Sequence, residues 1–310
     1  MRVALCTNIR PIRDEIGLPG RNQAIIDRLS EDGHAVDVLY GPERLLHGDA
    51  PSYDVGLLAP NDLLAPRPDP VGRLAAETAA LGLEAAGVPF VNSPLTRRHA
   101  ANKLLAHIAF RSAGLRQPAT WTFAELDDLH WPEAGLLVKP ITGSCGFGIS
   151  VAHSPGEARA LIAASGEPSF VQEIVHPARC IRVIATREHS VGRYEKRMPP
   201  GTLFAAITSG AQEVKLDPRA DLDDLGVAMV RAVGLDIVGV DILESTGGAL
   251  FALEANVNFG FYSRNREILD ALADQVELRG AGRSSSHAGA MASTSRRSTG
   301  SSRSRSASAR

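Results

Sequence analysis

The chain has 310 residues, a formal net charge of −2 at pH 7 and 44% hydrophobic residues, which is ordinary for a globular protein of two or three lobes. Its three cysteines (Cys6, Cys145 and Cys180) have no paired spacing, which indicates neither a disulfide framework nor a zinc site. Its apolar runs fall far short of the roughly 20 residues of a membrane helix. The start, 1–6, is interpreted as a strand and not as a signal peptide, so we expect a cytoplasmic protein.

The first ninety residues predict a small α/β lobe. A strand at 3–6, an amphipathic helix at 22–30 and a strand at 35–40 form a β-α-β unit, which implies parallel strands and a right-handed crossover. A further strand, a helix and a short strand follow before residue 92. The segment 10–21 leaves the carboxyl end of the first strand, where open α/β sheets bind ligands. Its charges fit either a substrate contact or a solvated loop.

A lysine and a glycine-rich loop stand in the middle of the chain. The buried strand 136–140 carries Lys139 near its end and runs into the loop 142–148, which contains three glycines. Glycines let backbone N–H groups turn toward an anion, and a lysine beside them supplies a point charge for phosphate. The loop lacks the Gly-Lys-Ser/Thr of a Walker A motif. We interpret strand, loop and strand as a hairpin that folds over a nucleotide as a flap.

Two later strands bring oxygen ligands together. The apolar run 237–240 ends at Asp241, and the turn Gly247-Gly248 leads into a strand that carries Glu254 and Asn256. Alternation places Glu254 and Asn256 on one face of their strand. Hard oxygen ligands in such a group suit Mg²⁺. The alternative is a pair of acids at solvated strand ends.

The C-terminal segment differs in composition from the rest. Residues 281–310 contain eleven serines, six arginines and no Asp or Glu. Such a segment buries too little apolar surface to offset its ordering entropy, so the tail 278–310 is predicted to be disordered. Three interpretations of this tail remain open: a flexible basic tail that contacts acidic partners, a solvated extension without a role, or an artefactual end of the reading frame.

Taken in chain order, these blocks resemble an ATP-grasp enzyme, and most closely the RimK-like amide ligases, over roughly residues 92–261. Asn102-Lys103-Leu104 resembles the helix start that carries the family's first phosphate lysine, and 170–174 resembles the hinge strand that holds adenine. The resemblance implies an α/β fold: a small Rossmann-like lobe at 1–92 and an ATP-grasp domain at 93–277. That domain would divide into a flap lobe at about 93–169 and a hinge and metal lobe at about 170–277.

The resemblance also implies an activity: an ATP-dependent carboxylate–amine ligase that forms an amide or peptide bond through an acyl phosphate. It would join an amino acid to a peptide, cofactor or natural-product acceptor, using ATP and two Mg²⁺ ions, with Mn²⁺ as the alternative ion. Its partners would be small-molecule or peptide carboxylates and amines, without nucleic acid or membrane, and a homo-oligomer is compatible with the sequence.

The resemblance assigns these roles residue by residue. The catalytic residues would be Arg182 and Lys139; ATP would contact Lys103, Lys139, Gly143, Ser144, Gly146, Gly148, Glu173 and Ile174; the metal ligands would be Asp241, Glu254 and Asn256; and the substrate would contact Arg193, Arg197 and Asn258.

Three positions depart from the family pattern. Cys180 stands where the family has an acid that holds ribose, and Phe204 and Ala206 stand where it has an arginine and an asparagine near the phosphates. Either the nucleotide affinity is lower or nearby groups such as Arg193, Lys196, Arg197 or Ser209 compensate. These departures keep two alternatives open: an ATP-grasp kinase that stops at phosphoryl transfer, and a catalytically impaired nucleotide-binding protein.

Overall fold

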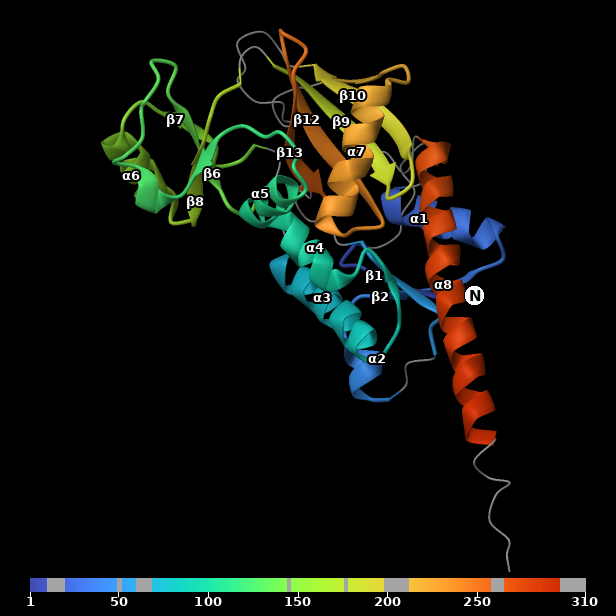
Figure 1. Ribbon diagram of the computed structural model, residues 1–310. Helices are drawn as coiled ribbons and strands as arrows, with labels where there is room; N and C mark the ends of the chain where they lie inside the picture. Colours follow the sequence, from blue (N-terminus) through green and yellow to red (C-terminus); the bar gives the residue numbers. More distant parts are fainter. Residues whose placement is uncertain are drawn as a thin grey trace, which may run out of the picture.

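The computed structural model describes residues 1–9, 20–48, 52–59, 69–143, 146–175, 178–197, 212–257 and 265–295, with the backbone alone at 178 and 283–295. These residues form three sheets and the helices around them (Figure 1). None of the described helices combines the length and apolarity that a membrane span requires.

The N-terminal lobe (1–92) is a parallel sheet in the order β2-β1-β3-β4, with strands at Arg2–Cys6 (β1), Ala35–Leu39 (β2), Val55–Leu58 (β3) and Phe90–Val91 (β4). The helices are α1 (Arg21–Glu31), the short α2 (Glu43–Leu46) and α3 (Pro70–Ala85). Alternation along β1 sends Val3 and Leu5 to the α1 face and Ala4 and Cys6 to the α3 face. The predicted β-α-β lobe is confirmed.

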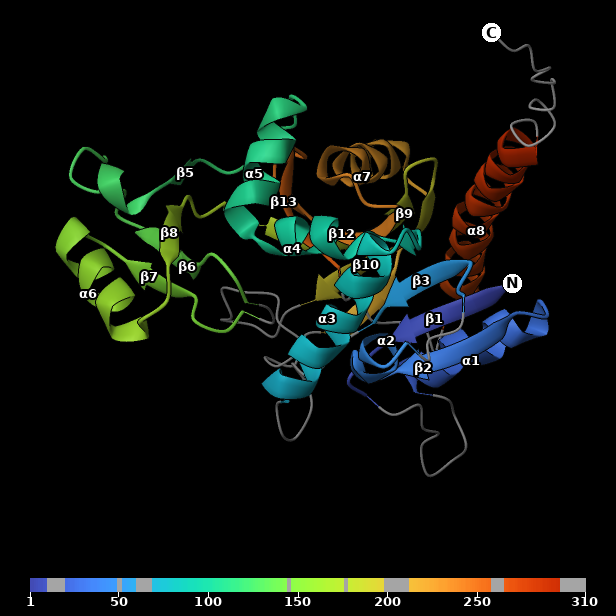
Figure 2. The same ribbon diagram turned by 90° about the horizontal axis from the view of Figure 1, so that it is seen from below.

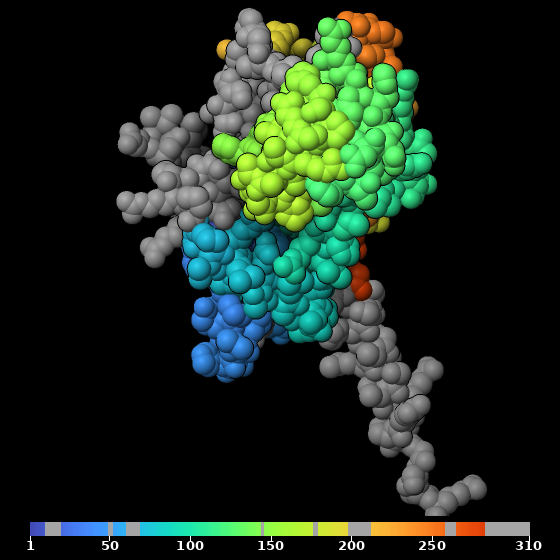
Figure 3. Space-filling view, turned by 90° about the vertical axis from the view of Figure 1, so that its left-hand side faces the viewer, coloured from blue at the N-terminus to red at the C-terminus, as the bar shows by residue number. Residues whose placement is uncertain are grey.

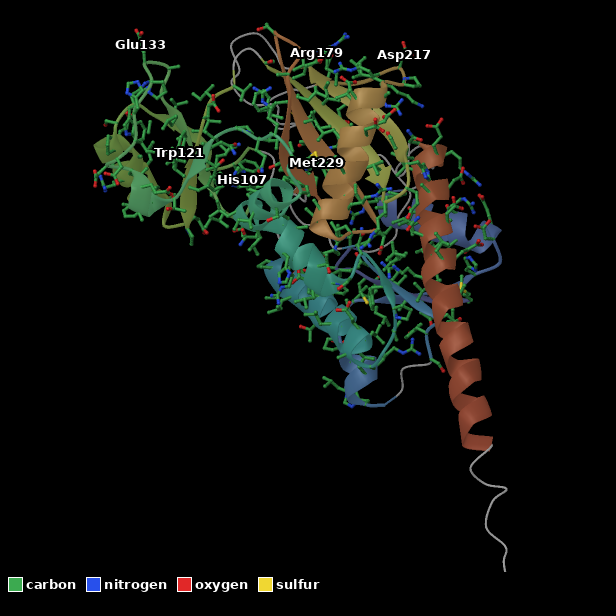
Figure 4. All side chains as sticks on the ribbon, in the orientation of Figure 1. His107, Trp121, Glu133, Arg179, Asp217 and Met229 are labelled. Atoms are coloured by element: carbon green, nitrogen blue, oxygen red, sulfur yellow. The ribbon has the colours of Figure 1, made fainter. Side chains whose placement is uncertain are left out.

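A second, smaller lobe, the lid lobe (118–175), stands apart from the rest of the molecule (Figures 1 and 2). Its antiparallel sheet has the order β5-β8-β6-β7, with strands Thr120–Trp121 (β5), Leu136–Pro140 (β6), Ser150–Ala152 (β7) and Ser169–Gln172 (β8). The 3₁₀ turn η1 (Phe123–Glu125) and α6 (Pro155–Ser165) complete it. Figure 3 views the molecule from the side of this lobe, and Figure 4 marks Trp121, which packs on its core.

The position of β8 corrects the expected lobe boundary. Residues 170–172 were assigned to the hinge and metal lobe, yet β8 pairs with β5 and β6 in the lid sheet. The change of lobe therefore comes after β8 and before β9. An apolar strand pattern predicts a strand but does not say which sheet it joins.

The largest sheet, with α7 on one face, forms the core lobe. Its antiparallel order is β11-β10-β9-β12-β13, with strands Ala178–Thr186 (β9), Ser190–Arg197 (β10), Gln212–Lys215 (β11), Ile237–Ser245 (β12) and Leu250–Asn256 (β13). Helix α7 (Ala220–Val233) buries Met229 against Val183, Val238 and Val240 (Figure 4). Because side chains alternate, Arg182 and Asp241 must point to the opposite face.

Helices α4 (Pro94–Ala101) and α5 (Lys103–Ser112) connect the lobes, and α8 (Arg266–Ser295) packs along α1 and β4. The N-terminal lobe, the core lobe and α8 meet at a set of buried hydrogen bonds around Asn92, a residue with φ 58°, which we call the joint. Its backbone N–H donates to Asp236 Oδ2 at 2.7 Å, and its Oδ1 accepts from the backbone N–H of Asp236 at 2.7 Å. Arg279 of α8 pairs with the same carboxylate.

This joint involves the start of the segment for which disorder was predicted. Disorder was predicted from residue 278 onward, but α8 continues to Ser295, and residues 296–310 lie outside the described residues. Arg279 has a buried carboxylate to pair with, and Gly280 lies so close to Met1 that a Cβ would clash with its sulfur. Composition revealed the serines and arginines but not these partners in the N-terminal and core lobes.

Candidate functional site

The acids predicted to bind metal lie together on the face of the core sheet opposite α7. Asp241 on β12 is the register partner of Glu254 on β13 and of Arg182 on β9. Asn256 Nδ2 lies 3.0 Å from Asp241 Oδ2 and 3.3 Å from Glu254 Oε1. The hairpin therefore brings together the three side chains that strand alternation had grouped.

Asp241 is held by two cations. Arg182 donates from Nε to Oδ1 at 2.8 Å and from Nη2 to Oδ2 at 3.0 Å, and Lys196 Nζ donates to Oδ2 at 2.6 Å. All three side chains are buried. Burial would raise the pKa of Asp241, but the charges of Arg182 and Lys196 outweigh it and hold that pKa well below its usual range. Asp241 is thus an anion at neutral pH.

Glu254 has a different environment. It is half-buried, and among the described residues its only hydrogen bond comes from Asn256, with no cation at ion-pairing distance. Its carboxylate therefore keeps oxygen lone pairs available beside an anionic aspartate. Two carboxylates on neighbouring strands fit Mg²⁺, which takes carboxylates together with substrate phosphates, and Asn256 turns its Nδ2 toward both of them.

Lys139 faces this cluster from β6 of the lid lobe. Its side chain is 6% exposed, and its Nζ donates to Gln172 Oε1 at 2.7 Å. Burial lowers the pKa of Lys139 to about 8; the negative charge of Glu254 opposes this shift and the positive charge of Lys103 adds to it. The lysine therefore lies within the electrostatic reach of both Glu254 and Lys103.

Lys103 closes the lid side of the site. It is the first residue of α5, which Asn102 caps by accepting from the N–H groups of Leu104 and Leu105 at 3.1 Å each. Its backbone N–H donates to the carbonyl of Ile141 at 2.9 Å, and its Nζ donates to the carbonyl of Gly143 at 2.6 Å. The helix start and the glycine loop are therefore in direct contact.

The glycine loop is described only in part. Gly143, Gly146 and Gly148 have φ values of 127°, 74° and 75°, a backbone region that favours glycine. Ser144 and Cys145 lie outside the described residues. The glycines at these positions are therefore required by the backbone, whatever the loop binds.

The hinge residues Glu173 and Ile174 follow β8. Glu173 uses its own backbone N–H to donate to the carbonyl of Ala119 at 2.9 Å, and its carboxylate accepts from the N–H of Ala119 at 3.0 Å. The backbone N–H of Ile174 has no partner among the described residues. A free N–H beside a strand end is the kind of group that recognises the edge of a planar base.

Two of the three predicted substrate residues, Arg193 and Arg197, are not part of this cluster. Arg193 points to the α7 face, where its Nε donates to Asp223 Oδ1 at 2.7 Å, and Arg197 follows it on the same face, 3.4 Å from Glu195. Asn258 lies outside the described residues, as do Phe204, Ala206 and Ser209. Lys196, considered from sequence only as a compensating group, takes the central place that Arg193 and Arg197 do not.

Cys180 borders the cluster on β9, next to Lys196 in the register of β10. Burial raises the pKa of its thiol to about 12, so the side chain is neutral at this point of the site. A neutral thiol neither pairs with a lysine nor acts as a carboxylate, which agrees with the departure noted in the sequence.

A cavity of about 450 Å³ lies elsewhere, between the α3–β4 turn, α4, Arg187 and Arg279. Arg187 and Arg279 both face the carboxylate of Asp236. This hollow therefore belongs to the joint between lobes and not to the cluster around Asp241.

Comparisons with known proteins agree with this geometry. The model of the RimK-like ATP-grasp domain matches residues 104–276. A probable alpha-L-glutamate ligase 2 of Hahella chejuensis is 30% identical over 209 residues, which cover 62% of this chain and 68% of that protein. A probable alpha-L-glutamate ligase of Parasynechococcus marenigrum is 30% identical over 187 residues, 57% of this chain but 40% of that longer protein.

A solved structure supports the fold independently. The ATP-grasp ligase PsnB, in complex with a minimal precursor, Mg and ADP, superposes with a TM-score of 0.62 at 19% identity, covering 90% of this chain and 98% of that one. At this identity the likeness concerns the arrangement of the lobes, which is that of the ATP-grasp fold.

Proposed function

The chain belongs to the RimK-like ATP-grasp family of ligases that form carbon–nitrogen bonds, and on this premise we propose that it joins an amino acid to a peptide, cofactor or natural-product acceptor through an acyl phosphate. The observation that carries the proposal is the cluster in which Asp241, Glu254 and Asn256 face the buried Lys139. Anionic oxygen ligands on one lobe and an uncompensated cation on the other suit a metal-bound phosphate chain between them.

ATP with Mg²⁺, when bound, would supply the phosphoryl group that activates a substrate carboxylate for attack by an amine. The residues of the chain would position the nucleotide and neutralise its charge. Asp241, Glu254 and Asn256 would hold the metal, and Lys103 and Lys139 would neutralise phosphate oxygens. Because phosphoryl transfer needs little covalent participation by protein, positioning and charge supply most of the catalysis.

Arg182 would stabilise the negative charge that develops on the activated carboxylate. It is already oriented by its two bonds to Asp241, so it loses little side-chain freedom when substrate arrives. The hairpin loop between β6 and β7 would close over the nucleotide and exclude water that otherwise hydrolyses an acyl phosphate. The backbone beside Glu173 and Ile174 would contact adenine.

The test is a screen of ADP release by the purified protein with ATP and Mg²⁺ against a matrix of carboxylates and amines. Glutamate heads the amines, because the relatives are named glutamate ligases. We expect release that needs both a carboxylate and an amine, and a product heavier than the acceptor by the amine less water. A stable phosphate ester as the product would instead identify a kinase, and no substrate-dependent release would contradict ligase activity.

A further inference from the structure

Lys139 is an unusual buried cation because its hydrogen-bond partner is neutral. Among the described residues Nζ donates only to Gln172 Oε1, whereas the other buried lysine of the site, Lys196, is bound to the carboxylate of Asp241. A buried amine costs free energy unless it is hydrogen-bonded. An amide oxygen satisfies that need without cancelling the charge.

An amide has two ends, and only its oxygen can accept from an ammonium group. Gln172 is 3% exposed, and its Nε2 donates to Thr120 Oγ1 at 2.9 Å, while that hydroxyl donates to the carbonyl of Pro118 at 3.1 Å. Because the Thr120 hydroxyl donates its hydrogen bond to a carbonyl, its oxygen is left to accept one from Gln172. The NH₂ end must therefore face Thr120 and the oxygen must face Lys139.

The sheet register places the residues of this hydrogen-bond chain next to one another. Thr120 on β5 is the direct partner of Gln172, the last residue of β8, and the hinge residue Glu173 follows it in the chain. The hydroxyl that orients Gln172 is thus on β5, beside the hinge.

We propose that Gln172 is a positioning residue which, oriented by Thr120, holds Lys139 in place and leaves its positive charge available to the nucleotide phosphates. The inference rests on the proposed function only in that a nucleotide occupies the site; it requires no ligase turnover. Gln172 itself acts through Lys139 and through no contact with a reacting atom.

The test is a double-mutant cycle on the affinity for ADP with Mg²⁺, measured by calorimetry without any acceptor. We expect Gln172→Leu to weaken ADP binding about tenfold and Lys139→Met about a hundredfold, as losses of hydrogen bonds and charge at a phosphate site do. In the Lys139→Met background, Gln172→Leu should add less than about twofold, because the residues act as one unit. Additive effects of the two substitutions would overturn the proposal.

Two further variants separate positioning from packing. Gln172→Glu keeps the shape but brings an anion to Lys139, so ADP binding should weaken about tenfold, whereas a packing role predicts affinity close to that of wild type. Thr120→Val should weaken binding about threefold and Thr120→Ser should restore it, since serine keeps the hydroxyl. Equal affinities for Thr120→Val and Thr120→Ser would contradict the role of the hydroxyl.

A matched control is Gln275→Leu, a buried glutamine of α8 remote from β6, which should bind ADP as wild type does. Thermal unfolding of each variant identifies losses of affinity that come from misfolding. If wild type binds no ADP at all, the nucleotide site and the proposed function fail together. If it binds ADP and the cycle is additive, only the role of Gln172 fails.

Discussion

On the core lobe, Lys196 and Arg182 share the carboxylate of Asp241, whereas among the described residues Lys139 on the lid lobe has only the amide of Gln172. Both arrangements give a buried cation a hydrogen-bond acceptor, but they differ in the net charge that remains. A carboxylate partner stabilises the cation and cancels it, while an amide partner leaves it uncompensated. The comparison indicates that the core lobe holds its acids in fixed positions, and that the lid lobe offers a positive charge to a ligand.

The largest expected effect is on the metal side of the comparison. Glu254→Ala should lower substrate-dependent ADP release by about a thousandfold or more, because the carboxylate proposed to hold Mg²⁺ is lost. Steady-state ADP release checks this prediction. The matched control is Glu244→Ala on β12, whose carboxylate pairs with Arg179 and Arg219 away from the cluster, and which should retain activity. Retained turnover in Glu254→Ala would reject the metal assignment.

The same substitution on the two lysines should separate the lobes by stability. Lys196→Met removes one partner of a buried ion pair and should lower the free energy of unfolding by about 3 kcal/mol. Lys139→Met should change it by less than about 1 kcal/mol, because removing an uncompensated buried charge offsets the loss of a hydrogen bond to Gln172. Urea unfolding at neutral pH measures both. Equal losses would show that the two cations are held alike.

A smaller effect is expected on ADP affinity, where the two lysines of the lid side, Lys103 and Lys139, should differ. Lys103→Met should weaken ADP binding by about tenfold, less than Lys139→Met, because Lys103 is half exposed and its Nζ already donates to the carbonyl of Gly143. Calorimetry with ADP and Mg²⁺ compares the two variants directly. A greater loss in Lys103→Met would reverse the order of the two phosphate lysines.

A further effect is a pH dependence of stability that is specific to Lys139. Burial lowers its pKa from 10.5 to about 8, so below that pH the folded and the unfolded chain both carry the proton. Between about 8 and 10.5 only the unfolded chain binds it, and the free energy of unfolding contributed by this group therefore rises with pH. Wild type should gain stability relative to Lys139→Met across this window in urea unfolding. A constant difference would contradict the lowered pKa.

The same ionisation should affect ligand binding in the opposite direction. As pH rises through about 8, Lys139 loses its charge and wild type should bind ADP less tightly, whereas Lys139→Arg stays charged and should show a flatter profile. Calorimetry at several pH values tests this. Parallel profiles for the two proteins would assign the pH dependence to another group.

Much of the site was predictable because it follows from local patterns. Glu254 and Asn256 are two residues apart on one strand, and a Gly-Gly turn returns that strand beside Asp241, so alternation alone groups them. Lys139 ends a short apolar run beside glycines whose positive φ values the loop requires. Gln172 was missed because its role is a contact between strands; its polar side chain at the end of the apolar run Phe170-Val171 was the available signal.

The basic residues of β10 were harder to assign. Arg193, Lys196 and Arg197 lie within five positions, and nothing in their order says which of them faces the acids. The β9–β10 pairing has an irregularity between Ser190 and Gly192 that resets the alternation, after which Lys196 aligns with Cys180 and Arg193 with Val183. Arg193 consequently meets Asp223 of α7, and Lys196 meets Asp241.

The sequence by itself determined the fold family, the parallel N-terminal lobe and the residues proposed to bind metal and phosphate, because strand periodicity, turn glycines and motif order are properties of neighbouring residues. Only the tertiary structure decided which sheet β8 joins, that α8 packs along α1 and β4, and that Lys139 has an amide and Lys196 a carboxylate as its partner. Those outcomes depend on contacts between distant segments, where burial and pairing set the energy of a charge more than its place in the chain does.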